Sequence, residues 1–369
     1  MKGILKINEP IIGDEEIEAV TTVLKSGNLT ERSGFGPYVL EFERKFAKFV
    51  DTKYAIAMNS GTSSIHAALL AAGVGPGDDV LVPSFTFSST ASSVLLTGAR
   101  PIFADIDPRT YCINIDTIND AITERTRAII PVHLYGMPAD LDPIIEIARS
   151  HDIVIIEDAA QAHGALYKDR KIGSIGDMTC FSFYAGKNMT TGEGGMVTTN
   201  DETYAETLRT IRIHGEERPY WVTRVGLNYR MTEIAASIGI CQLAKLPEFL
   251  KKRGENANEL LKKLSNMEKL ILPIQLDDRE HAWNVFTVRL KGKYARRRIK
   301  ILQKLFSKQI YATVYYETPV HLLPLYHKIT KVSLPETEKA SREVFSLPVH
   351  PKIDFKDLTY IANTLKSIL

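Results

Sequence analysis

A single lysine, Lys187, stands between aromatic residues and a glycine-rich turn in the segment 181–200, FSFYAGKNMTTGEGGMVTTN. A lysine in such a place can clamp a phosphate, act as a nucleophile or have no chemical role. In a P-loop the glycines precede the lysine, as G-x-x-x-x-G-K-[ST], whereas here they follow it. The glycines at 192, 194 and 195 are therefore interpreted as a tight return of the chain beside Lys187 and not as a phosphate cradle.

The segment 59–64, NSGTSS, is a candidate anion site. It follows an apolar run and opens a predicted helix, and the backbone amides at a helix start attract anions. Gly61 permits a ligand to approach the backbone closely, and Thr62 and Ser63 can add hydroxyl donors. The alternative is an ordinary helix cap, because Ser and Thr are also common capping residues.

An acid pair, Glu157 and Asp158, comes directly after the apolar run 153–156. Carboxylates at the end of a buried strand are poorly placed for contact with solvent, so at least one of them requires a partner inside the protein. A helix-capping aspartate is the alternative. His163, shortly after this pair, is interpreted as a hydrogen-bonded structural histidine and not as a catalyst.

Phosphate donors at one loop, an acid at a second and a lysine at a third match the requirements of pyridoxal 5′-phosphate. The phosphate of this cofactor binds amides and hydroxyls, its protonated pyridine nitrogen pairs with a carboxylate, and its aldehyde forms a Schiff base with a lysine. Phe87, which follows a further strand, would cover one face of the ring. No metal site is expected.

Alternating strands and helices position these residues between residues 54 and 200. Apolar strands that are joined through helices predict an α/β fold with a mostly parallel sheet covered by helices on both faces. In such sheets ligands bind beyond the carboxyl ends of the strands, which is where the candidate residues lie. The predicted strands are 54–58, 79–82, 101–104, 128–132, 153–156, 179–182 and 196–199, and the predicted helices are 63–73, 86–97, 116–122 and 141–151.

A smaller second domain is predicted after the large one. A long charged helix is expected beyond Pro247, followed by a strand at 283–290, a helix at 296–308, a strand at 310–316 and two terminal helices. We therefore place a cofactor-binding large domain at 1–246, which includes an N-terminal substrate-loop segment, and a small C-terminal α+β domain at 247–369.

The composition argues against several classes of partner. A net charge of +2, from 46 basic and 44 acidic residues, gives no electrostatic reason to expect a nucleic acid polymer or an anionic membrane. The basic cluster 291–300 is interpreted as the solvated start of a helix, with an anion-binding patch as the alternative. The three cysteines form no C-x-x-C pair, and no signal peptide or membrane span is recognisable, so a cytoplasmic location is expected.

The chain resembles the DegT/DnrJ/EryC1/StrS family of sugar aminotransferases, within the fold-type I pyridoxal-phosphate enzymes, along nearly its whole length. Its overall sequence resembles the perosamine-synthase-like branch of this family. The motifs that carry the resemblance are IGDEEI at 12–17, LKSG at 24–27, NSGT at 59–62, PSFTF at 83–87, PVHLYG at 131–136, EDAAQ at 157–161, the segment 181–200, GLNYRM at 226–231, TPVH at 318–321 and LPVH at 347–350.

The resemblance implies roles for the residues after the strands. It makes Lys187 the residue that forms the internal aldimine and Asp158 the partner of the pyridine nitrogen. Asn228 would reach the phosphate from a neighbouring subunit, which implies a homodimer with shared active sites. The remaining cofactor contacts implied by the resemblance are Gln161 on the ring hydroxyl side, Phe87 on one ring face, and Gly61, Thr62 and Ser182 at the phosphate.

The sugar site is less clearly defined by the resemblance than the cofactor site. Asn28, Thr30 and His321 lie where relatives line the sugar-nucleotide pocket, but relatives commonly have Trp at the position of Asn28. A second departure is Gly186, where relatives usually have Thr. This glycine either loosens the turn before Lys187 or removes a hydroxyl contact.

The resemblance implies a ping-pong transaminase. It would move an amino group from an amino acid, L-glutamate by family analogy, to a nucleotide-linked keto-deoxysugar, with a 4-keto-6-deoxyhexose favoured over a 3-keto sugar. Related dehydratases carry His in place of the lysine, so Lys187 favours transamination. Two alternatives stay open: another fold-type I enzyme that acts on a free amino acid, and a non-catalytic regulatory relative.

Overall fold

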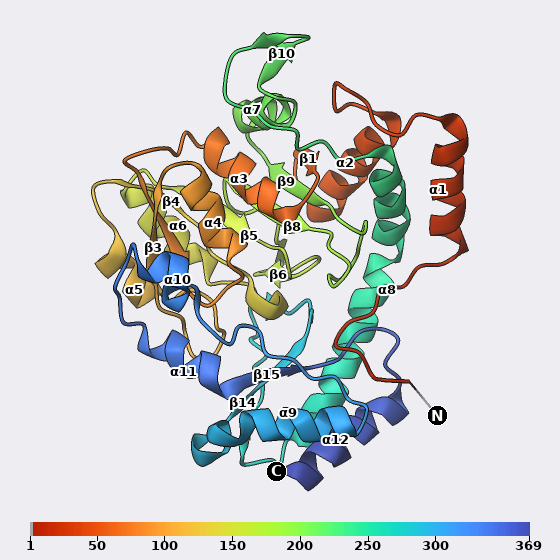
Figure 1. The fold of residues 1–369 in the computed structure, drawn as a ribbon, viewed down its shortest axis with the longest axis vertical. Coiled ribbons are helices and arrows are strands. Elements are labelled where there is room, and N and C mark those ends of the chain that lie inside the picture. Colours follow the sequence, from red (N-terminus) through yellow and green to blue (C-terminus); the bar gives the residue numbers. More distant parts are fainter. Residues whose placement is uncertain (1–2) are drawn as a thin grey trace.

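The computed structural model describes residues 3–369 and contains a central seven-stranded sheet (Figure 1). Its strands are β1 (Tyr54–Met58), β2 (Asp79–Pro83), β3 (Arg100–Ala104), β4 (Thr126–Ile129), β5 (Val154–Asp158), β8 (Met178–Ser182) and β9 (Gly195–Thr199). They lie in the order β1-β9-β8-β5-β4-β2-β3. Only the pairings of β9 with β1 and β8 are antiparallel, so the predicted mostly parallel sheet is confirmed.

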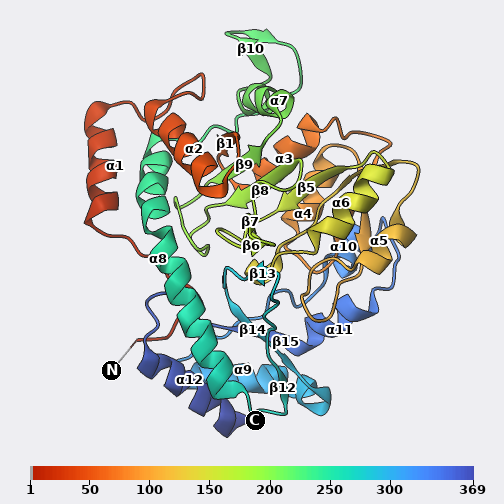
Figure 2. The same ribbon diagram turned by 180° about the vertical axis from the view of Figure 1, so that it is seen from behind.

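Helices cover both faces of this sheet (Figures 1 and 2). One face packs against α3 (Gly61–Ala71), α4 (Ser89–Leu96) and α7 (Glu202–Arg212), and the other against α2 (Pro37–Val50), α5 (Ile115–Ala121), α6 (Leu141–Ser150) and the first half of α8 (Glu233–Leu264). Successive side chains of a strand point to opposite faces, so Val80 and Val82 join one core and Leu81 joins the other. Strands buried on both faces therefore read as continuous apolar runs.

The strands and helices predicted between residues 54 and 200 all occur, with ends displaced by no more than three residues. The displaced ends have local causes. At α3, for example, Ser60 caps the helix by accepting a hydrogen bond from the backbone N–H of Ser63, so the helix begins at Gly61 and not at Ser63. Two short strands, β6 (Leu166–Tyr167) and β7 (Arg170–Lys171), and the 3₁₀ turn η1 (Leu134–Gly136) were not predicted.

The C-terminal region has its own hydrophobic core beside a small antiparallel sheet. Phe286, Leu305, Leu347 and Ile361 are fully buried there. The helix α8 runs unbroken through Pro247, so the predicted division at residue 246 falls inside a helix and stays a prediction. The elements of this region are β12 (Leu270–Ile271), β13 (Arg279–Glu280), β14 (Phe286–Leu290), η2 (Gly292–Arg297), α9 (Arg298–Ser307), η3 (Val320–Leu322), α10 (Pro324–His327), α11 (Pro335–Glu343), β15 (Val344–Leu347) and α12 (Phe355–Ile368).

The predicted strand at 310–316 is wrong. Both edges of β14 are already paired, one with β12 and the other with the unpredicted strand β15. Residues 310–316 make only isolated bridges, between Ile310 and Leu5 and between Thr313 and Ser346 on β15. The segment is therefore free to leave the small sheet and to carry Tyr315 and Tyr316 to a cavity of the large domain.

Two segments outside the central sheet extend the molecule. The helix α1 (Asp14–Ser26) packs along α8, where Lys245 Nζ lies 2.8 Å from Glu16 Oε2. The hairpin of β10 (Glu216–Arg218) and β11 (Trp221–Val222) projects from the end of the molecule that is opposite α12 (Figure 1). Tyr220 at its tip is 83% exposed, although the guanidinium of Arg32 lies 3.9 Å from the centre of its ring.

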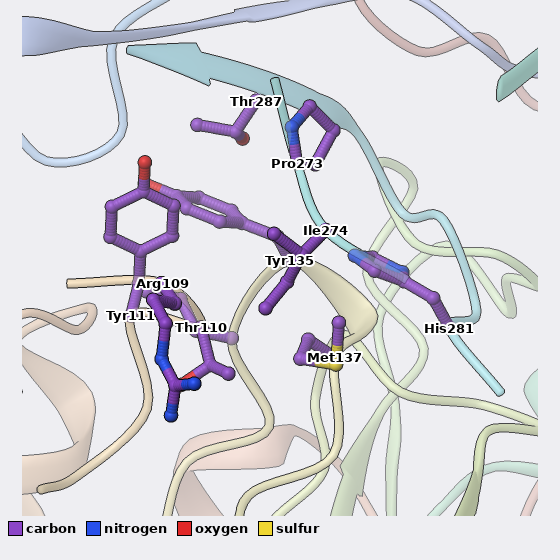
Figure 3. Close-up of a pocket in the computed structure, with 10 residues that line it drawn as sticks. Arg109, Thr110, Tyr111, Tyr135, Met137, Pro273, Ile274, His281 and Thr287 are labelled. Atoms are coloured by element: carbon purple, nitrogen blue, oxygen red, sulfur yellow. The ribbon is translucent and has the colours of Figure 1, made fainter. Parts of the chain in front are cut away.

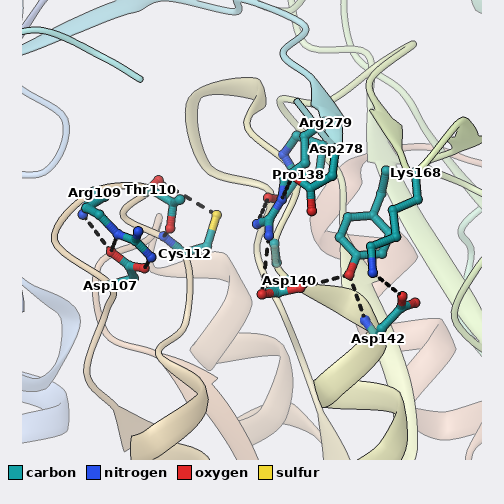
Figure 4. A network of polar contacts seen from close by, with 12 residues as sticks. Asp107, Arg109, Thr110, Cys112, Pro138, Asp140, Asp142, Lys168, Asp278 and Arg279 are labelled. Atoms are coloured by element: carbon teal, nitrogen blue, oxygen red, sulfur yellow. Dashed lines mark hydrogen bonds and ion pairs between the residues drawn. The ribbon is translucent and has the colours of Figure 1, made fainter. Parts of the chain in front are cut away.

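Packing and polar contacts join the C-terminal region to the sheet. Tyr111, Tyr135 and Met137 lie opposite Pro273 and His281 around a cavity of only about 10 Å³, which has room for no ligand larger than water (Figure 3). Beside it, Arg279 of β13 pairs with Asp140 at 3.2 Å, and Tyr167 Oη donates to the same carboxylate (Figure 4). These contacts hold residues 273–287 against the large domain.

Among residues 3–369, no helix is long and apolar enough to cross a membrane. The predicted cytoplasmic location stays a prediction.

We expect Arg212→Met to destabilise the fold strongly. Arg212 is fully buried, and its guanidinium donates to Glu43 and, at 3.1 Å, to the carbonyl of Ala57 on β1. Its removal leaves a buried carboxylate without a cation, which costs about 3–5 kcal/mol. Urea unfolding measures the loss. Arg109→Met, which breaks an exposed pair with Asp107, is the control and should cost less than about 1 kcal/mol. Equal losses in the two variants would contradict the assignment.

Candidate active site

A cavity of about 540 Å³ lies beyond the carboxyl ends of the parallel strands. Asp158 is the last residue of β5 and Ser182 the last of β8, and the two strands are paired in register. The parallel topology therefore brings together side chains that are far apart in the sequence. The sequence-predicted residues that line the cavity are Gly61, Thr62, Phe87, Asp158, Gln161, Ser182 and Lys187.

Lys187 presents a free amine to this cavity. Its backbone N–H donates to Tyr184 at 2.9 Å, whereas its Nζ has no hydrogen bond or ion pair within residues 3–369. Burial lowers the pKa of Lys187 below that of an ordinary lysine, and the negative charge of Asp158 opposes this shift. The amine is thereby shifted towards its neutral, nucleophilic form.

The two carboxylates of the acid pair have different environments. Glu157 is fully buried and accepts hydrogen bonds from Gly176 N at 2.7 Å and Thr179 Oγ1 at 2.8 Å, and its other oxygen lies 2.8 Å from His133 Nε2. It is satisfied inside the protein. Asp158 lines the cavity, so it is the carboxylate that is available to a ligand.

Thr90 on α4 holds the Asp158 carboxylate. Its hydroxyl donates to Asp158 Oδ2 at 2.8 Å, and the backbone N–H of Ala160 donates to Oδ1 at 3.1 Å. Thr86 Oγ1 lies 3.0 Å from Thr90 Oγ1 and extends this chain of hydroxyls. Thr90 was not predicted as a site residue, because nothing in the sequence distinguishes it from the neighbouring Ser and Thr residues until α4 is placed beside β5.

The start of α3 has the features of both a helix cap and an anion site, the two interpretations of the NSGTSS segment. Ser60 and Ser63 form a capping box, and Ser63 Oγ also donates to Asn59 Oδ1 at 2.7 Å. Ser63 therefore lies in the cap and outside the cavity lining. The amides of Gly61 and Thr62 belong to the first helical turn, where N–H groups have no intrahelical acceptor. They remain available to an anion.

Close backbone approach explains several glycines around the cavity. A Cβ atom at Gly61 would lie 2.7 Å from Ser182 Cβ, and one at Gly195 would lie 2.2 Å from the carbonyl oxygen of Ser60. Gly192 has a φ of +83°, and the N–H of Phe183 donates to Gly194 at 2.8 Å. The predicted tight return beside Lys187 is confirmed.

Several aromatic and polar residues of the cavity were not predicted. Gln161 accepts from the backbone N–H of Tyr135 at 2.7 Å and donates to Tyr316 Oη at 3.0 Å, so two tyrosines fix its amide. The ring of Phe87, which is 59% exposed, lies 6.3 Å from that of Tyr316. The unpredicted residues on the wall include Tyr184, Glu193, Asn284, Tyr315 and Tyr316.

Besides Ser63, four predicted residues do not line the cavity of the single chain. Asn28 and Thr30 are exposed in the loop after α1, and Asn228 is exposed beyond the β10–β11 hairpin. His321 is buried and lies 2.6 Å from Ser84 Oγ through Nδ1 and 3.6 Å from Glu338 through Nε2. Their assigned roles stay predictions.

His163 is packed in the core and not in the cavity lining. It is fully buried, with the rings of Phe181 and Phe183 at 5.5 and 5.7 Å. Burial lowers its pKa to about 3, with a further contribution from the charge of Lys187. The buried position agrees with the predicted structural role, but the predicted hydrogen bonding is wrong, because neither ring nitrogen has a hydrogen-bond partner among residues 3–369.

The donor set of this cavity fits pyridoxal 5′-phosphate. It contains an amine without a partner, a carboxylate held at the end of a buried strand, and free amides at the start of a helix, with hydroxyls of Thr62 and Ser182 nearby. These are the three kinds of group that the aldehyde, the pyridine nitrogen and the phosphate require.

Comparisons with known proteins identify the family. The DegT/DnrJ/EryC1/StrS aminotransferase family matches residues 10–366. The GDP-perosamine synthase of Caulobacter vibrioides is 39% identical over 351 residues, which cover 94% of this chain and 94% of that protein. The dTDP-3-amino-3,4,6-trideoxy-α-D-glucose transaminase of Streptomyces venezuelae is 39% identical over 341 residues, which cover 91% of this chain and 87% of that protein.

A solved structure agrees with this match. S. venezuelae DesV, crystallised in complex with a ketimine intermediate, superposes with a TM-score of 0.91 at 37% identity, over 96% of this chain and 94% of that chain. The chain belongs to the DegT/DnrJ/EryC1/StrS aminotransferase family, whose enzymes depend on pyridoxal phosphate.

Proposed function

We propose that this protein transfers an amino group from L-glutamate to a nucleotide-linked 4-keto-6-deoxyhexose. The observation that carries the proposal is the free amine of Lys187 in one cavity with the Asp158 carboxylate and the start of α3. The names of the two relatives support a nucleotide sugar as the acceptor. A 4-keto sugar as the acceptor agrees with the resemblance of the sequence to the perosamine-synthase-like branch.

Pyridoxal phosphate, when bound, supplies an aldehyde that forms Schiff bases and a ring that accepts electrons. Lys187 would hold the cofactor covalently through Nζ. Burial lowers the pKa of this amine, which favours its neutral form, so Nζ would accept a proton from the donor carbon and return it at the carbon that joins the cofactor ring. The same lysine acts again when the keto sugar is aminated, so two half-reactions follow in ping-pong order.

Asp158 orients the ring by pairing with its protonated nitrogen. Thr90 and the N–H of Ala160 hold the two carboxylate oxygens, so the side chain is pre-organised for this contact. Gln161 would contact the ring hydroxyl, and Phe87 would cover one ring face. The amides of Gly61 and Thr62 and the hydroxyls of Thr62 and Ser182 would hold the phosphate, whereas the predicted contact from Ser63 is not supported, because its hydroxyl is used in the helix cap.

The outer part of the cavity is the proposed place of the sugar. Tyr184 and Tyr315 offer aromatic faces and hydroxyl groups on the cavity wall, and Glu193 adds an acid. Such a wall suits a hydroxylated ring, which needs flat apolar contact and polar partners together. Asn28, Thr30 and His321 are retained as the sugar-nucleotide residues proposed from the resemblance.

A homodimer with shared active sites is part of the proposal. Asn228 would reach the phosphate from the neighbouring subunit, which suits its exposed position outside the cavity of its own chain. The nearby residues Tyr220, Trp221 and Val225 are 83%, 56% and 75% exposed, and an apolar arm of this kind favours burial against a partner. A cytoplasmic location is proposed as well, because nucleotide-activated sugars are the proposed substrates.

Two alternatives have different spectroscopic outcomes. An enzyme that acts on free amino acids would consume an amino acid without needing a keto sugar. A regulatory relative would bind the cofactor without changing its spectrum when glutamate is added. Loss of colour with glutamate therefore separates the two enzymes from the regulatory relative, and a requirement for a keto sugar separates the two enzymes from each other.

We expect the purified protein with pyridoxal phosphate to be yellow and to lose this colour when L-glutamate is added. Lys187→Ala should lose the yellow band and at least about a hundredfold in the rate of the glutamate half-reaction, because it removes both the covalent anchor and the general base. Absorbance spectroscopy and stopped-flow kinetics measure the two effects. Lys356→Ala, an exposed lysine on α12, is the matched control and should behave as the parent. Normal turnover by Lys187→Ala would rule out the assigned role.

We expect 4-keto-6-deoxyhexoses to be aminated in preference to 3-keto sugars. The measurement is a panel of GDP-, UDP- and dTDP-linked keto sugars, each incubated with glutamate, with the aminated product identified by mass spectrometry. Preference for a 3-keto sugar would correct the position of amination but keep the reaction class. If glutamate removes the yellow colour but no keto sugar gives an aminated product, the result would favour an enzyme that acts on free amino acids.

We expect the capture of pyridoxal phosphate by the cofactor-free protein to become faster as the pH rises through the pKa of Lys187, because only the neutral amine reacts. Asp158 raises this pKa, so Asp158→Asn should move the midpoint of the pH profile to lower pH. Stopped-flow measurement of the yellow band at several pH values gives both midpoints. A midpoint that stays in place or moves to higher pH would contradict the proposed charge interaction.

A further inference from the structure

The carbonyl group next to Lys187 accepts hydrogen bonds from two distant parts of the chain. Asn8 Nδ2, near the beginning of the sequence, donates to the carbonyl oxygen of Gly186. Asn284 Nδ2, in the C-terminal region, donates to the same oxygen at 3.4 Å. The peptide group that precedes the reactive lysine is therefore held by two side-chain amides.

The residue after Lys187 is held as well. Asn188 is buried, and its Nδ2 donates to the carbonyl of Ala282 at 2.8 Å, while its Oδ1 accepts from Asn284 Nδ2 at 3.1 Å. Residues 186 and 188, on either side of Lys187, are thus both hydrogen-bonded to residues 282–284. Rotation of its backbone would break these contacts together.

A single buried arginine connects these partners. Arg253 of α8 is 2% exposed, and its Nη1 donates to the carbonyls of Trp283 and Asn284, each at 3.1 Å. Its Nη2 donates to Asn8 Oδ1 at 2.9 Å. One guanidinium therefore holds the side-chain amide of Asn8 directly and the main chain that carries the Asn284 amide, because the fork of Arg presents its donors in a fixed plane.

Arg253 is an unusual choice for a residue that only stabilises the fold. It has no carboxylate partner within residues 3–369, and a buried guanidinium without one is costly. Burial lowers its pKa to about 9, so it is still charged at neutral pH. Its Nε has no hydrogen-bond partner either, so this cost is offset only by the oxygens of residues 8, 283 and 284.

The same helix contains a buried amide that lacks this connection. Asn256, nearly one turn after Arg253, donates to the carbonyls of Val349, His350 and Ile353 at 3.2 Å each. None of these groups contacts the segment 186–188. Asn256 is therefore a matched reference for a polar residue of α8 that holds the C-terminal region alone.

We propose that Arg253 is a positioning residue for Lys187, acting through Asn8 and Asn284 on the carbonyl of Gly186. This inference rests on the proposed function, in which Lys187 supplies the reactive amine. The guanidinium keeps the two amides in place, and these keep the Lys187 backbone oriented so that Nζ enters the cavity. The reactive lysine thereby depends on contacts with both ends of the chain.

The proposal also accounts for Gly186. A Cβ atom at this position would lie 3.3 Å from Cε1 of Tyr184, which is closer than an ordinary contact. With glycine the Tyr184 ring can lie beside the loop. The turn before Lys187 is then ordered through the carbonyl of residue 186 and needs no side chain there.

The decisive variant is Asn8→Asp, because it keeps the contact between Arg253 and residue 8 but removes the contact between residue 8 and the Gly186 carbonyl. Aspartate still accepts from Arg253, so the buried arginine stays paired, but it cannot donate to the Gly186 carbonyl. We expect amide hydrogen exchange over residues 183–191 to become about tenfold faster, as measured by mass spectrometry on the full-length protein. The rate at which the cofactor-free protein captures pyridoxal phosphate should fall about tenfold as well.

Arg253→Met should show the same two changes, with Asn256→Ala as the control. Asn256→Ala is expected to lower the thermal midpoint while exchange over 183–191 and the capture rate stay at the parent values. Arg253→Lys, which keeps the charge but not the fork, should give intermediate exchange. If Arg253→Met does not fold, Asn8→Asp alone decides the question.

Two results would overturn the proposal: unchanged exchange over 183–191 in Asn8→Asp, or the same acceleration in Asn256→Ala. The exchange measurement needs no catalytic activity, so its outcome is separate from that of the proposed function. A parent protein that develops no yellow band with pyridoxal phosphate would refute the proposed function and leave the exchange result standing.

Discussion

Charging an amine inside an enclosed cavity is costly, and the geometry around Lys187 follows from this constraint. Burial lowers the pKa of the lysine, and Asp158 opposes the shift, so the two side chains set the state of the amine together. Asp158 in turn is held by Thr90 and by the N–H of Ala160. A site of this kind works only if backbone segments from several strands and helices stay in register, and the parallel sheet supplies that register.

The site is assembled from many short contacts that each have a structural purpose of their own. The capping box of α3 satisfies the helix start and at the same time leaves the amides of Gly61 and Thr62 free. The glycines after Lys187 let β9 pass close to the carbonyl of Ser60. Arg253 joins α8 to the lysine segment through Asn8 and residues 283–284. Loss of fold and loss of function are therefore best separated by variants that remove one donor and keep its partner satisfied.

Most of the large domain was predictable because its signals are local. Between residues 54 and 200, the apolar runs and the Ser, Thr and Gly residues that begin helices indicate all seven strands of the central sheet and four helices to within three residues. The strand at 310–316 was predicted wrongly for a non-local reason. Its residue types suit a strand, but the edges of β14 are paired with β12 and β15, and no sequence pattern states which edge is already occupied. The tyrosines at 315 and 316 consequently escaped the list of cavity residues.

By itself, the sequence determined the parallel sheet, the three loops that follow its strands and the residue types at those loops, because periodicity and motif order are local properties of the chain. Only the tertiary structure decided which groups meet. It assigned Glu157 to His133 and Thr179 and left Asp158 to the cavity, since hydrogen-bond partners from other elements satisfy one carboxylate and not the other. It also placed Asn8, Asn284 and Arg253 around Lys187, because contacts between residues so far apart in the sequence depend on packing and not on sequence spacing.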